Sequence, residues 1–223
     1  MTLESPPHGD FILPTEIPKI YPITDTEVSG LPHAEQVRRL AAGGARFIQI
    51  RDKNVSGREF YESALSALEI ARSVGVKIII NDRVDIALAI RADGVHLGQD
   101  DLPPAEARKI LGENAIVGFS THTVEQALAA ANEPIDYIAI GPIYPTTSKT
   151  NPDDVLGISG LKMVRQAIPA IQLVAIGGIT HANISDVFAT GADSAAVISY
   201  LLNEPLQITE KFQMLHTNTE SNK

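Results

Sequence analysis

The segment DYIAIGPIYPTTSK, from Asp136 to Lys149, combines a buried strand pattern with groups that bind phosphate. Its apolar run Ile138–Ile140 predicts a strand that ends at Gly141-Pro142. Three hydroxyls and an ammonium group follow, on Thr146, Thr147, Ser148 and Lys149. Hydroxyls, free backbone N–H groups and a cation are the partners that a phosphate ester requires. The loop after this strand is therefore predicted to bind a phosphate group.

A second polar cluster lies at the end of the predicted strand 47–52, where Gln49, Arg51 and Lys53 alternate with Ile50 and Asp52. Because strand residues alternate between faces, the first three point to one side and the other two face away. Arginine can bind phosphate oxygens with two N–H groups, and lysine adds a point charge. The pattern favours a clamp for a polyanion, with Gln49 able to read the edge of a heterocycle. An ordinary solvated charge cluster is the alternative.

Two carboxylates, Asp82 and Asp101, follow the neighbouring predicted strands 76–82 and 94–98. Two carboxylates together with phosphate oxygens and water are a usual set of ligands for Mg²⁺. Asp82 could instead pair with Arg83 or cap the next helix, and Asp101 could also be a cap. Asp100 competes with Asp101 as the ligand.

Further polar groups follow other predicted strands. Asn81 is interpreted as an amide that faces a ligand, or as part of a structural turn, and Ser120 as a hydrogen-bond donor, because no nucleophile elbow surrounds it. His96 and His122 could be catalytic or structural. Gly177-Gly178 would let backbone N–H groups approach a phosphate, or would only form a tight turn. The loop 145–157 is long for its position and could close over a ligand.

Strand and helix patterns alternate along the chain. The predicted strands span 20–25, 47–52, 76–82, 94–98, 115–121, 135–141, 171–177 and 194–199, and helices are expected near 34–43, 57–74, 84–90, 104–111, 123–131, 159–168, 182–190 and 206–214. Eight such units at this length predict an α/β fold, a single-domain (β/α)8 TIM barrel, over residues 19–215. An open doubly wound sheet is disfavoured because no GxGxxG follows the first strand. In a barrel the carboxyl ends of all strands meet at one mouth, so the polar residues would share one site, together with Thr24-Asp25 and Ile198-Ser199.

The amino-acid composition excludes several classes of function and site for this chain. The 223 residues carry a net charge of −9, contain no cysteine and are 44% hydrophobic but only 5% aromatic. We therefore expect an aliphatic core, no disulfide, no thiolate metal site and no nucleic-acid partner. Neither a membrane span nor a signal peptide is visible, which favours a cytoplasmic enzyme that acts on small phosphorylated substrates. A homo-oligomer is possible. Irregular tails are expected at residues 1–18 and 216–223.

With these residues in place, the chain resembles the thiamine-phosphate synthase family. The matching segments, in the expected order from about residue 20 to 200, are IYPITD, QIRDK, INDRVDIAL, ADGVHLGQDDL, GFSTHT, DYIAIGPIYPTTSK, AIGGI and VIS. The resemblance implies that 4-amino-2-methyl-5-hydroxymethylpyrimidine diphosphate loses pyrophosphate and is joined to the ring nitrogen of 4-methyl-5-(2-phosphoethyl)thiazole. Our hypothesis is a dissociative substitution, because the aminopyrimidine can stabilise a methylene cation without a protein nucleophile.

The resemblance also implies residue roles. Arg51, Lys53 and Lys149 would be catalytic, and Mg²⁺ would be held by Asp82 and Asp101. The pyrimidine diphosphate would be bound by Gln49, Ile50, Arg51, Asp52, Lys53, Asn81, Ser120 and Lys149. The thiazole phosphate would be bound by Thr146, Thr147, Ser148, Gly177, Gly178, Ile198 and Ser199.

Two substitutions depart from the family pattern, and both should be harmless. Ser148 stands where the family usually has the second threonine of Thr-x-Thr-Lys, which keeps the hydroxyl, and Ile50 replaces a leucine. Two other functions remain possible on the same barrel. A thiazole tautomerase would use His122 as an acid–base group, and a sensor would bind phosphate ligands without turnover. The complete QIRDK segment and the two carboxylates argue against both.

Overall fold

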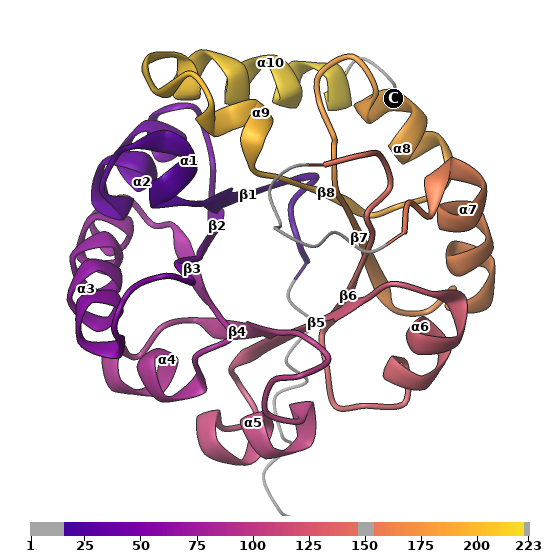
Figure 1. Ribbon diagram of the computed structural model, residues 1–223, viewed down its shortest axis with the longest axis horizontal. Helices are drawn as coiled ribbons and strands as arrows, with labels where there is room; N and C mark the ends of the chain where they lie inside the picture. The colour runs from indigo at the N-terminus through magenta and orange to yellow at the C-terminus, as the bar shows by residue number, and fades with distance from the viewer. Residues whose placement is uncertain (1–15, 147–153, 221–223) are drawn as a thin grey trace, which may run out of the picture.

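Eight parallel strands close into a barrel in which each strand pairs with its neighbours in sequence and β8 pairs with β1. The computed structural model describes residues 16–146 and 154–220. The strands are β1 (Ile20–Thr24), β2 (Phe47–Ile50), β3 (Lys77–Asn81), β4 (Gly94–Leu97), β5 (Ile116–Thr121), β6 (Tyr137–Ile140), β7 (Gln172–Ile176) and β8 (Ser194–Val197). Figure 1 looks along the barrel, with helices surrounding the ring of strands. The predicted single-domain (β/α)8 barrel is confirmed.

The helices follow the strands in the expected alternation. They are α1 (Thr26–Ser29), α2 (His33–Ala42), α3 (Gly57–Ser73), α4 (Val84–Ile90), α5 (Pro104–Leu111), α6 (Val124–Ala130), α7 (Gly157–Ala167), α8 (Ile184–Ala189), α9 (Ser199–Leu202) and α10 (Ile208–Glu220), with the 3₁₀ turn η1 (Pro205–Gln207) before α10. The short helices α1 and α9 and the turn η1 were not expected. They are too short to show a helical repeat of apolar residues in the sequence.

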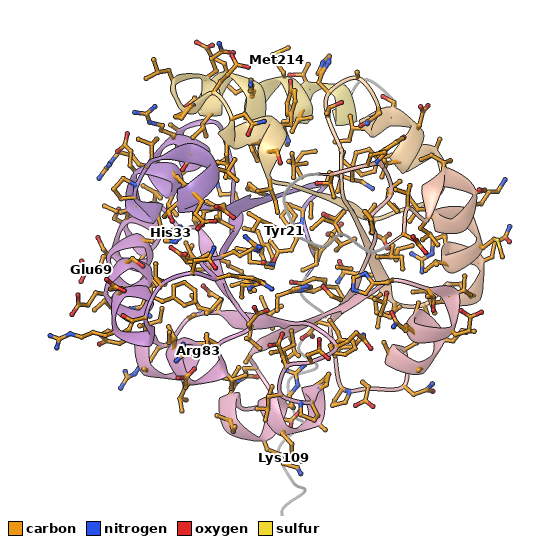
Figure 2. The ribbon with its side chains drawn as sticks, viewed as in Figure 1. Tyr21, His33, Glu69, Arg83, Lys109 and Met214 are labelled. Atoms are coloured by element: carbon orange, nitrogen blue, oxygen red, sulfur yellow. The ribbon has the colours of Figure 1, made fainter. Side chains whose placement is uncertain are left out.

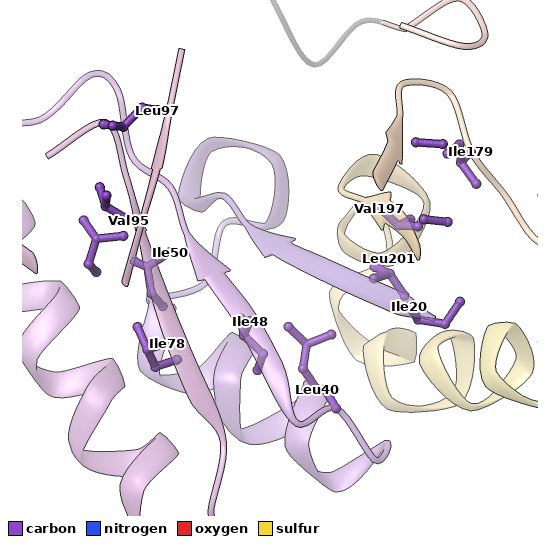
Figure 3. Close-up of a cluster of buried hydrophobic side chains, with 14 of the residues drawn as sticks. Ile20, Leu40, Ile48, Ile50, Ile78, Val95, Leu97, Ile179, Val197 and Leu201 are labelled. Atoms are coloured by element: carbon purple, nitrogen blue, oxygen red, sulfur yellow. The ribbon is translucent and has the colours of Figure 1, made fainter. Parts of the chain in front are cut away.

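Strand alternation produces two separate layers of buried side chains. One layer fills the space between the strands and the surrounding helices, and it is almost entirely aliphatic. Figure 3 shows part of it, where Ile48 and Ile50 of β2 and Ile78 of β3 share a cluster with Leu40 of α2. The second layer lies inside the barrel and includes Ile23 and Ile79.

The interior of the barrel departs from the expected aliphatic core. Tyr21, Phe47 and Tyr137 are each at most 1% exposed and belong to the interior cluster. The ring of Tyr21 packs edge-on against Phe47, with centroids 4.8 Å apart, and against Tyr137 at 5.8 Å. Low aromatic content therefore did not exclude aromatics from the core, because the few present are concentrated where the barrel needs large side chains.

The described residues near the two ends of the chain differ in structure. Residues 16–18 belong to no helix or strand, but Ile17 is 3% exposed and its N–H donates to the Gln172 side chain over 2.7 Å. The chain is also helical to Glu220, where an irregular tail was expected from residue 216. Residues 1–15 and 221–223 lie outside the described part of the chain. Within that part, none of the helices combines the length and apolarity that spanning a membrane requires.

Candidate active site

A cavity of about 770 Å³ opens at the carboxyl ends of the strands. From the predicted pyrimidine diphosphate and metal residues, its lining includes Gln49, Arg51, Lys53, Asn81, Asp82, Asp101 and Ser120. From the predicted thiazole phosphate residues, it includes Thr146, Gly177, Gly178, Ile198 and Ser199. The barrel therefore brings both sets to one site, as the parallel strands predict.

The side chains of two predicted ligand-binding residues do not reach this cavity. Ile50 is fully buried in the layer between strands and helices. Asp52 turns toward α1 and α2, where it accepts a hydrogen bond from the Thr26 hydroxyl over 2.9 Å and lies 3.4 Å from Nε2 of His33. Strand alternation is the reason, since these residues face away from Gln49, Arg51 and Lys53. Thr147, Ser148 and Lys149 lie outside the described residues.

Arg51 is held by Asp25, the residue that follows β1. The two side chains form an ion pair in which the guanidinium is 14% exposed and the carboxylate 8%. The other carboxylate oxygen of Asp25 accepts hydrogen bonds from the N–H groups of Glu27 and Val28, which caps α1. Gln36 of α2 hydrogen bonds to the backbone N–H and carbonyl of Asp25. The Asp25 carboxylate thus ties the clamp arginine to the start of α1, and the backbone of the same residue is held by α2.

The second cation of the clamp faces the predicted metal residues. Nζ of Lys53 lies 3.4 Å from the Asp82 carboxylate. Burial raises the pKa of Asp82 above its usual range, Lys53 opposes that rise, and the neighbouring Asp101 carboxylate adds to it. The Asp101 carboxylate is thus close enough to repel that of Asp82, and both acids line the cavity. Excess negative charge is therefore concentrated at this point of the rim.

The structural alternatives for both acids are excluded. Arg83 pairs with Asp85 over 2.6 Å, and α4 has no side-chain cap, so Asp82 is neither an ion-pair partner of Arg83 nor a helix cap. Asp101 accepts a hydrogen bond from the N–H of Gly98 over 2.6 Å within its own loop, while Pro103 occupies the cap position of α5.

The backbone at Asp82 is unusual. Its φ is 62°, a left-handed conformation that aspartate tolerates better than most residues. Its N–H donates to the carbonyl of His96 over 2.8 Å, and the next N–H, of Arg83, donates to the carbonyl of Asn81 over 2.7 Å. These bonds hold the turn that directs the carboxylate to the rim.

Ser120 and the two histidines lie on the same side of the cavity. Nε2 of His96 is 2.8 Å from the Ser120 hydroxyl, and its Nδ1 is 3.0 Å from the hydroxyl of Tyr137. Nδ1 of His122 is 2.7 Å from the Gly141 carbonyl, so that nitrogen carries a proton. His96 Nδ1 contacts a phenol where a Ser-His-Asp triad would have a carboxylate.

Gly177 and Gly178 have φ values of 102° and 63°, in the region that favours glycine. A Cβ on Gly177 would approach Pro142 to 2.6 Å, and one on Gly178 would approach the Pro145 carbonyl to 2.5 Å. Glycine is therefore required both for the turn and for its contact with the loop after β6. This contact brings the two predicted phosphate loops together.

Sequence reasoning missed the roles of Asp25, Tyr21 and Tyr137. Asp25 was recognised as a strand-end residue, but its pairing with Arg51 joins positions 26 residues apart. The alternation of Tyr21, Ile23 and Asp25 was the available signal, because it places Tyr21 and Ile23 on the inward face of β1 and Asp25 just past the end of the strand in the same register.

Known proteins resemble this chain over most of its length. The sequence model of the family described as "Thiamine monophosphate synthase" matches residues 20–201. The thiamine-phosphate synthase of Chloroflexus aurantiacus is 44% identical over 182 residues, which are 81% of this chain and 83% of that protein. The thiamine-phosphate synthase of Methanoculleus marisnigri is 45% identical over 186 residues, covering 83% and 88%.

A solved structure agrees with these matches. The thiamine phosphate pyrophosphorylase of Pyrococcus furiosus superposes with a TM-score of 0.81 at 36% identity, covering 91% of this chain and 96% of that one. The chain therefore belongs to the thiamine-phosphate synthase family.

Proposed function

We propose that this protein is a transferase that joins 4-amino-2-methyl-5-hydroxymethylpyrimidine diphosphate to 4-methyl-5-(2-phosphoethyl)thiazole, with release of pyrophosphate and formation of thiamine phosphate. The observation that carries the proposal is the meeting of Arg51, Lys53 and the Asp82–Asp101 pair around one cavity in a chain of this family. The curated relatives described above are both named thiamine-phosphate synthase. A tautomerase or a sensor has no comparable support.

The cations Arg51 and Lys53 bind the diphosphate. Negative charge grows on the leaving pyrophosphate as the C–O bond breaks, so these cations stabilise the transition state more than the bound substrate. Asp25 takes part of the donor capacity of Arg51, but a guanidinium has five N–H donors and can bind phosphate with the others. Lys149 is expected from the sequence to add a third cation.

Asp82 and Asp101 would hold Mg²⁺. Both carboxylates line the cavity, and repulsion from Asp101 adds to the rise that burial causes in the pKa of Asp82. A divalent cation held by the two acids would offset that repulsion. Over the described residues 16–146 and 154–220, no cluster of three or more His, Asp or Glu side chains forms a complete metal cage. Two carboxylates suit Mg²⁺, which keeps several waters and takes substrate phosphate oxygens as further ligands. When bound, the ion would neutralise charge on the diphosphate.

The pyrimidine ring is recognised by amides and a hydroxyl, and no protein nucleophile attacks it. Gln49 and Asn81 are 2% and 7% exposed, so their amides are fixed before a ligand arrives. Ser120 is held by His96 and donates or accepts a hydrogen bond. Loss of pyrophosphate then generates a methylene cation that the aminopyrimidine ring stabilises, and the thiazole nitrogen attacks it from a bound position.

The thiazole phosphate is placed between the loop after β6 and the loops after β7 and β8. Thr146, Gly177 and Gly178 come from the first two loops, and Ile198 and Ser199 from the third. Thr147 and Ser148 are expected to contribute hydroxyls. Placing the thiazole nitrogen behind the methylene cation also shields that cation from water.

The direct test is incubation of the purified protein with both substrates and Mg²⁺. Thiamine phosphate detected by mass, with an equal amount of pyrophosphate, supports the proposal. Binding of both substrates without either product would contradict it, and would favour a sensor.

A further inference from the structure

A chain of hydrogen bonds crosses the inside of the barrel from Gln49 on β2 to Ser120 on β5. Gln49 Nε2 is 2.9 Å from the Tyr21 hydroxyl, which is 2.9 Å from the Tyr137 hydroxyl. The Tyr137 hydroxyl is 3.0 Å from His96 Nδ1, and His96 Nε2 is 2.8 Å from the Ser120 hydroxyl. Tyr21, labelled in Figure 2, lies inside the ring of strands. Both end residues line the cavity, so the chain links two separate ligand-facing groups.

Each hydroxyl in the chain has one proton, and a neutral imidazole has one N–H and one lone pair. In one pattern, the Gln49 amide donates to Tyr21, Tyr21 to Tyr137, Tyr137 to His96 and His96 to Ser120. Ser120 then has its proton to donate to a ligand, and Gln49 has its carbonyl oxygen to accept from one. In the other pattern the Gln49 amide is turned so that its carbonyl oxygen accepts from Tyr21, and every other donor is reversed. Ser120 then accepts from a ligand and the Gln49 N–H groups donate to one.

Mixed patterns are disfavoured by burial. Any mixture sets two protons or two lone pairs against each other at one link, or leaves a phenol proton without an acceptor, within a group of residues that are at most 7% exposed apart from Ser120. A buried polar group without its partner is costly, and each link passes its direction to the next. The five groups are therefore expected to reverse together.

We propose that Gln49 and Ser120 act as one hydrogen-bonding unit. Tyr21, Tyr137 and His96 are positioning residues that give the two ends opposite hydrogen-bonding roles toward the ligand. One end donates while the other accepts. An aminopyrimidine offers an amine donor and ring-nitrogen acceptors, which this pairing matches. The inference rests on the proposed function, because it assumes that the pyrimidine ring lies between these two groups.

Two further features support a chain built for this purpose. A Cβ at Gly118 would lie 2.4 Å from the Tyr137 hydroxyl oxygen and 2.0 Å from the ring carbon that carries it, so glycine on β5 makes the space for this phenol. Tyr137 also stacks on His96, with centroids 5.5 Å apart and planes at 20°. Burial raises the pKa of Tyr21 and of Tyr137, so both phenols keep their protons.

The test is a double-mutant cycle in two backgrounds, read as kcat/KM for the pyrimidine diphosphate. Gln49→Ala, Ser120→Ala and the double variant are measured in the wild-type protein and again in Tyr137→Phe. In the wild-type background, the factor by which the double variant lowers kcat/KM should be about fivefold smaller than the product of the two single-variant factors. In the Tyr137→Phe background the losses should multiply. Coupling through the ligand alone would survive this substitution, so equal coupling in both backgrounds overturns the proposal.

Tyr137→Phe and Tyr21→Phe should each raise the KM for the pyrimidine diphosphate about fivefold and leave the KM for the thiazole phosphate unchanged. Tyr61→Phe, on the outer surface of α3, is the matched control and should change neither. Melting temperatures identify a variant that fails to fold, and Tyr21→Phe then replaces Tyr137→Phe in the cycle. Equal changes in both KM values would indicate a merely structural role and would overturn the proposal.

A readout independent of turnover separates this inference from the proposed function. In protein labelled with ¹⁵N-histidine, Gln49→Ala should shift the ring nitrogens of His96, assigned with a His96→Gln variant, although Gln49 does not hydrogen bond to His96 directly. Tyr137→Phe should abolish that response. Unchanged His96 signals in Gln49→Ala overturn the coupling. Absence of thiamine phosphate in the wild-type assay, with the response intact, overturns the proposed function instead.

Discussion

Asp25 pairs with Arg51 while it also caps α1, so one carboxylate connects the end of β1 to the cation that follows β2. The pair is largely buried, with side-chain exposures of 8% for Asp25 and 14% for Arg51. Long arginine side chains lose much conformational freedom when they are fixed, and this ion pair removes that cost from substrate binding. The position of the clamp thus depends on a residue that need not touch the substrate.

Asp25→Asn should lower kcat/KM for the pyrimidine diphosphate about tenfold, because the amide still caps α1 but no longer holds Arg51 by charge. The melting temperature should change little. Steady-state kinetics with Glu35→Gln as a control, which removes an ion pair on α2, checks this. Kinetics equal to the wild type would show that Arg51 needs no such support.

Arg51→Ala and Lys53→Ala should each lower turnover by roughly 10²-fold, a loss of about 3 kcal/mol in transition-state stabilisation. Each cation acts on charge that develops on the leaving group. Pyrophosphate release under saturating substrates is the measurement. Arg58→Ala on α3 is the control, since its side chain is 87% exposed and pairs with Glu62 at the surface. An unchanged kcat in both site variants refutes the clamp.

Asp82→Ala should raise the Mg²⁺ concentration needed for half-maximal activity sharply, because one of the two proposed ligands is lost. EDTA should abolish activity of the wild type, and added Mg²⁺ should restore it. Glu69→Ala on the exposed face of α3 controls for removal of a carboxylate. Full activity of the wild type in EDTA would rule out the metal assignment.

His33 should make the protein less stable in mild acid. Its ring is fully buried, with Nδ1 2.9 Å from the Thr24 hydroxyl, and burial lowers its pKa below the ordinary 6.5. The unfolded chain therefore takes up a proton at this ring before the folded protein does. The contribution of neutral His33 to the free energy of unfolding is therefore fully present above the ordinary pKa, and it decreases as the pH falls through that value.

Urea unfolding at about pH 7.5 and about pH 5.5 measures this effect. The free energy of unfolding should fall more between these two conditions in the wild type than in His33→Gln, which cannot take up a proton. The difference between the two proteins isolates His33 from the carboxylates that titrate at lower pH. An equal fall in both proteins would mean that the pKa of His33 is not lowered.

The sequence predicted the eight strands and their order because each is a short apolar run bounded by turn residues. It also predicted that Gln49, Arg51 and Lys53 share a face, since alternation is a local property of the strand. Asp82 and Asp101 were placed together for a similar reason, as they follow neighbouring parallel strands. These inferences needed only local geometry and the rule that strand ends converge in a barrel.

Other features were not accessible from local patterns. The short helices α1 and α9 have too few residues for a periodic signal, and the C-terminal helix continues through a polar segment to Glu220. The resemblance placed Asp52 among the residues that bind the diphosphate, although strand alternation predicted that it faces away from the clamp, and it bonds to Thr26 of α1 instead. Its partners, Thr26 of α1 and His33 of α2, are distant in sequence, and the local pattern did not show them.

The amino-acid sequence by itself therefore determined the barrel, the family and most of the residues that reach the mouth. Only the tertiary structure decided the partners: Asp25 for Arg51, Lys53 for Asp82, and the buried chain from Gln49 through Tyr137 to Ser120. The physical reason is that strand and helix patterns depend on neighbours a few residues apart. Hydrogen bonds and ion pairs inside a closed barrel join residues that are distant in sequence, and their geometry exists only after the strands have closed.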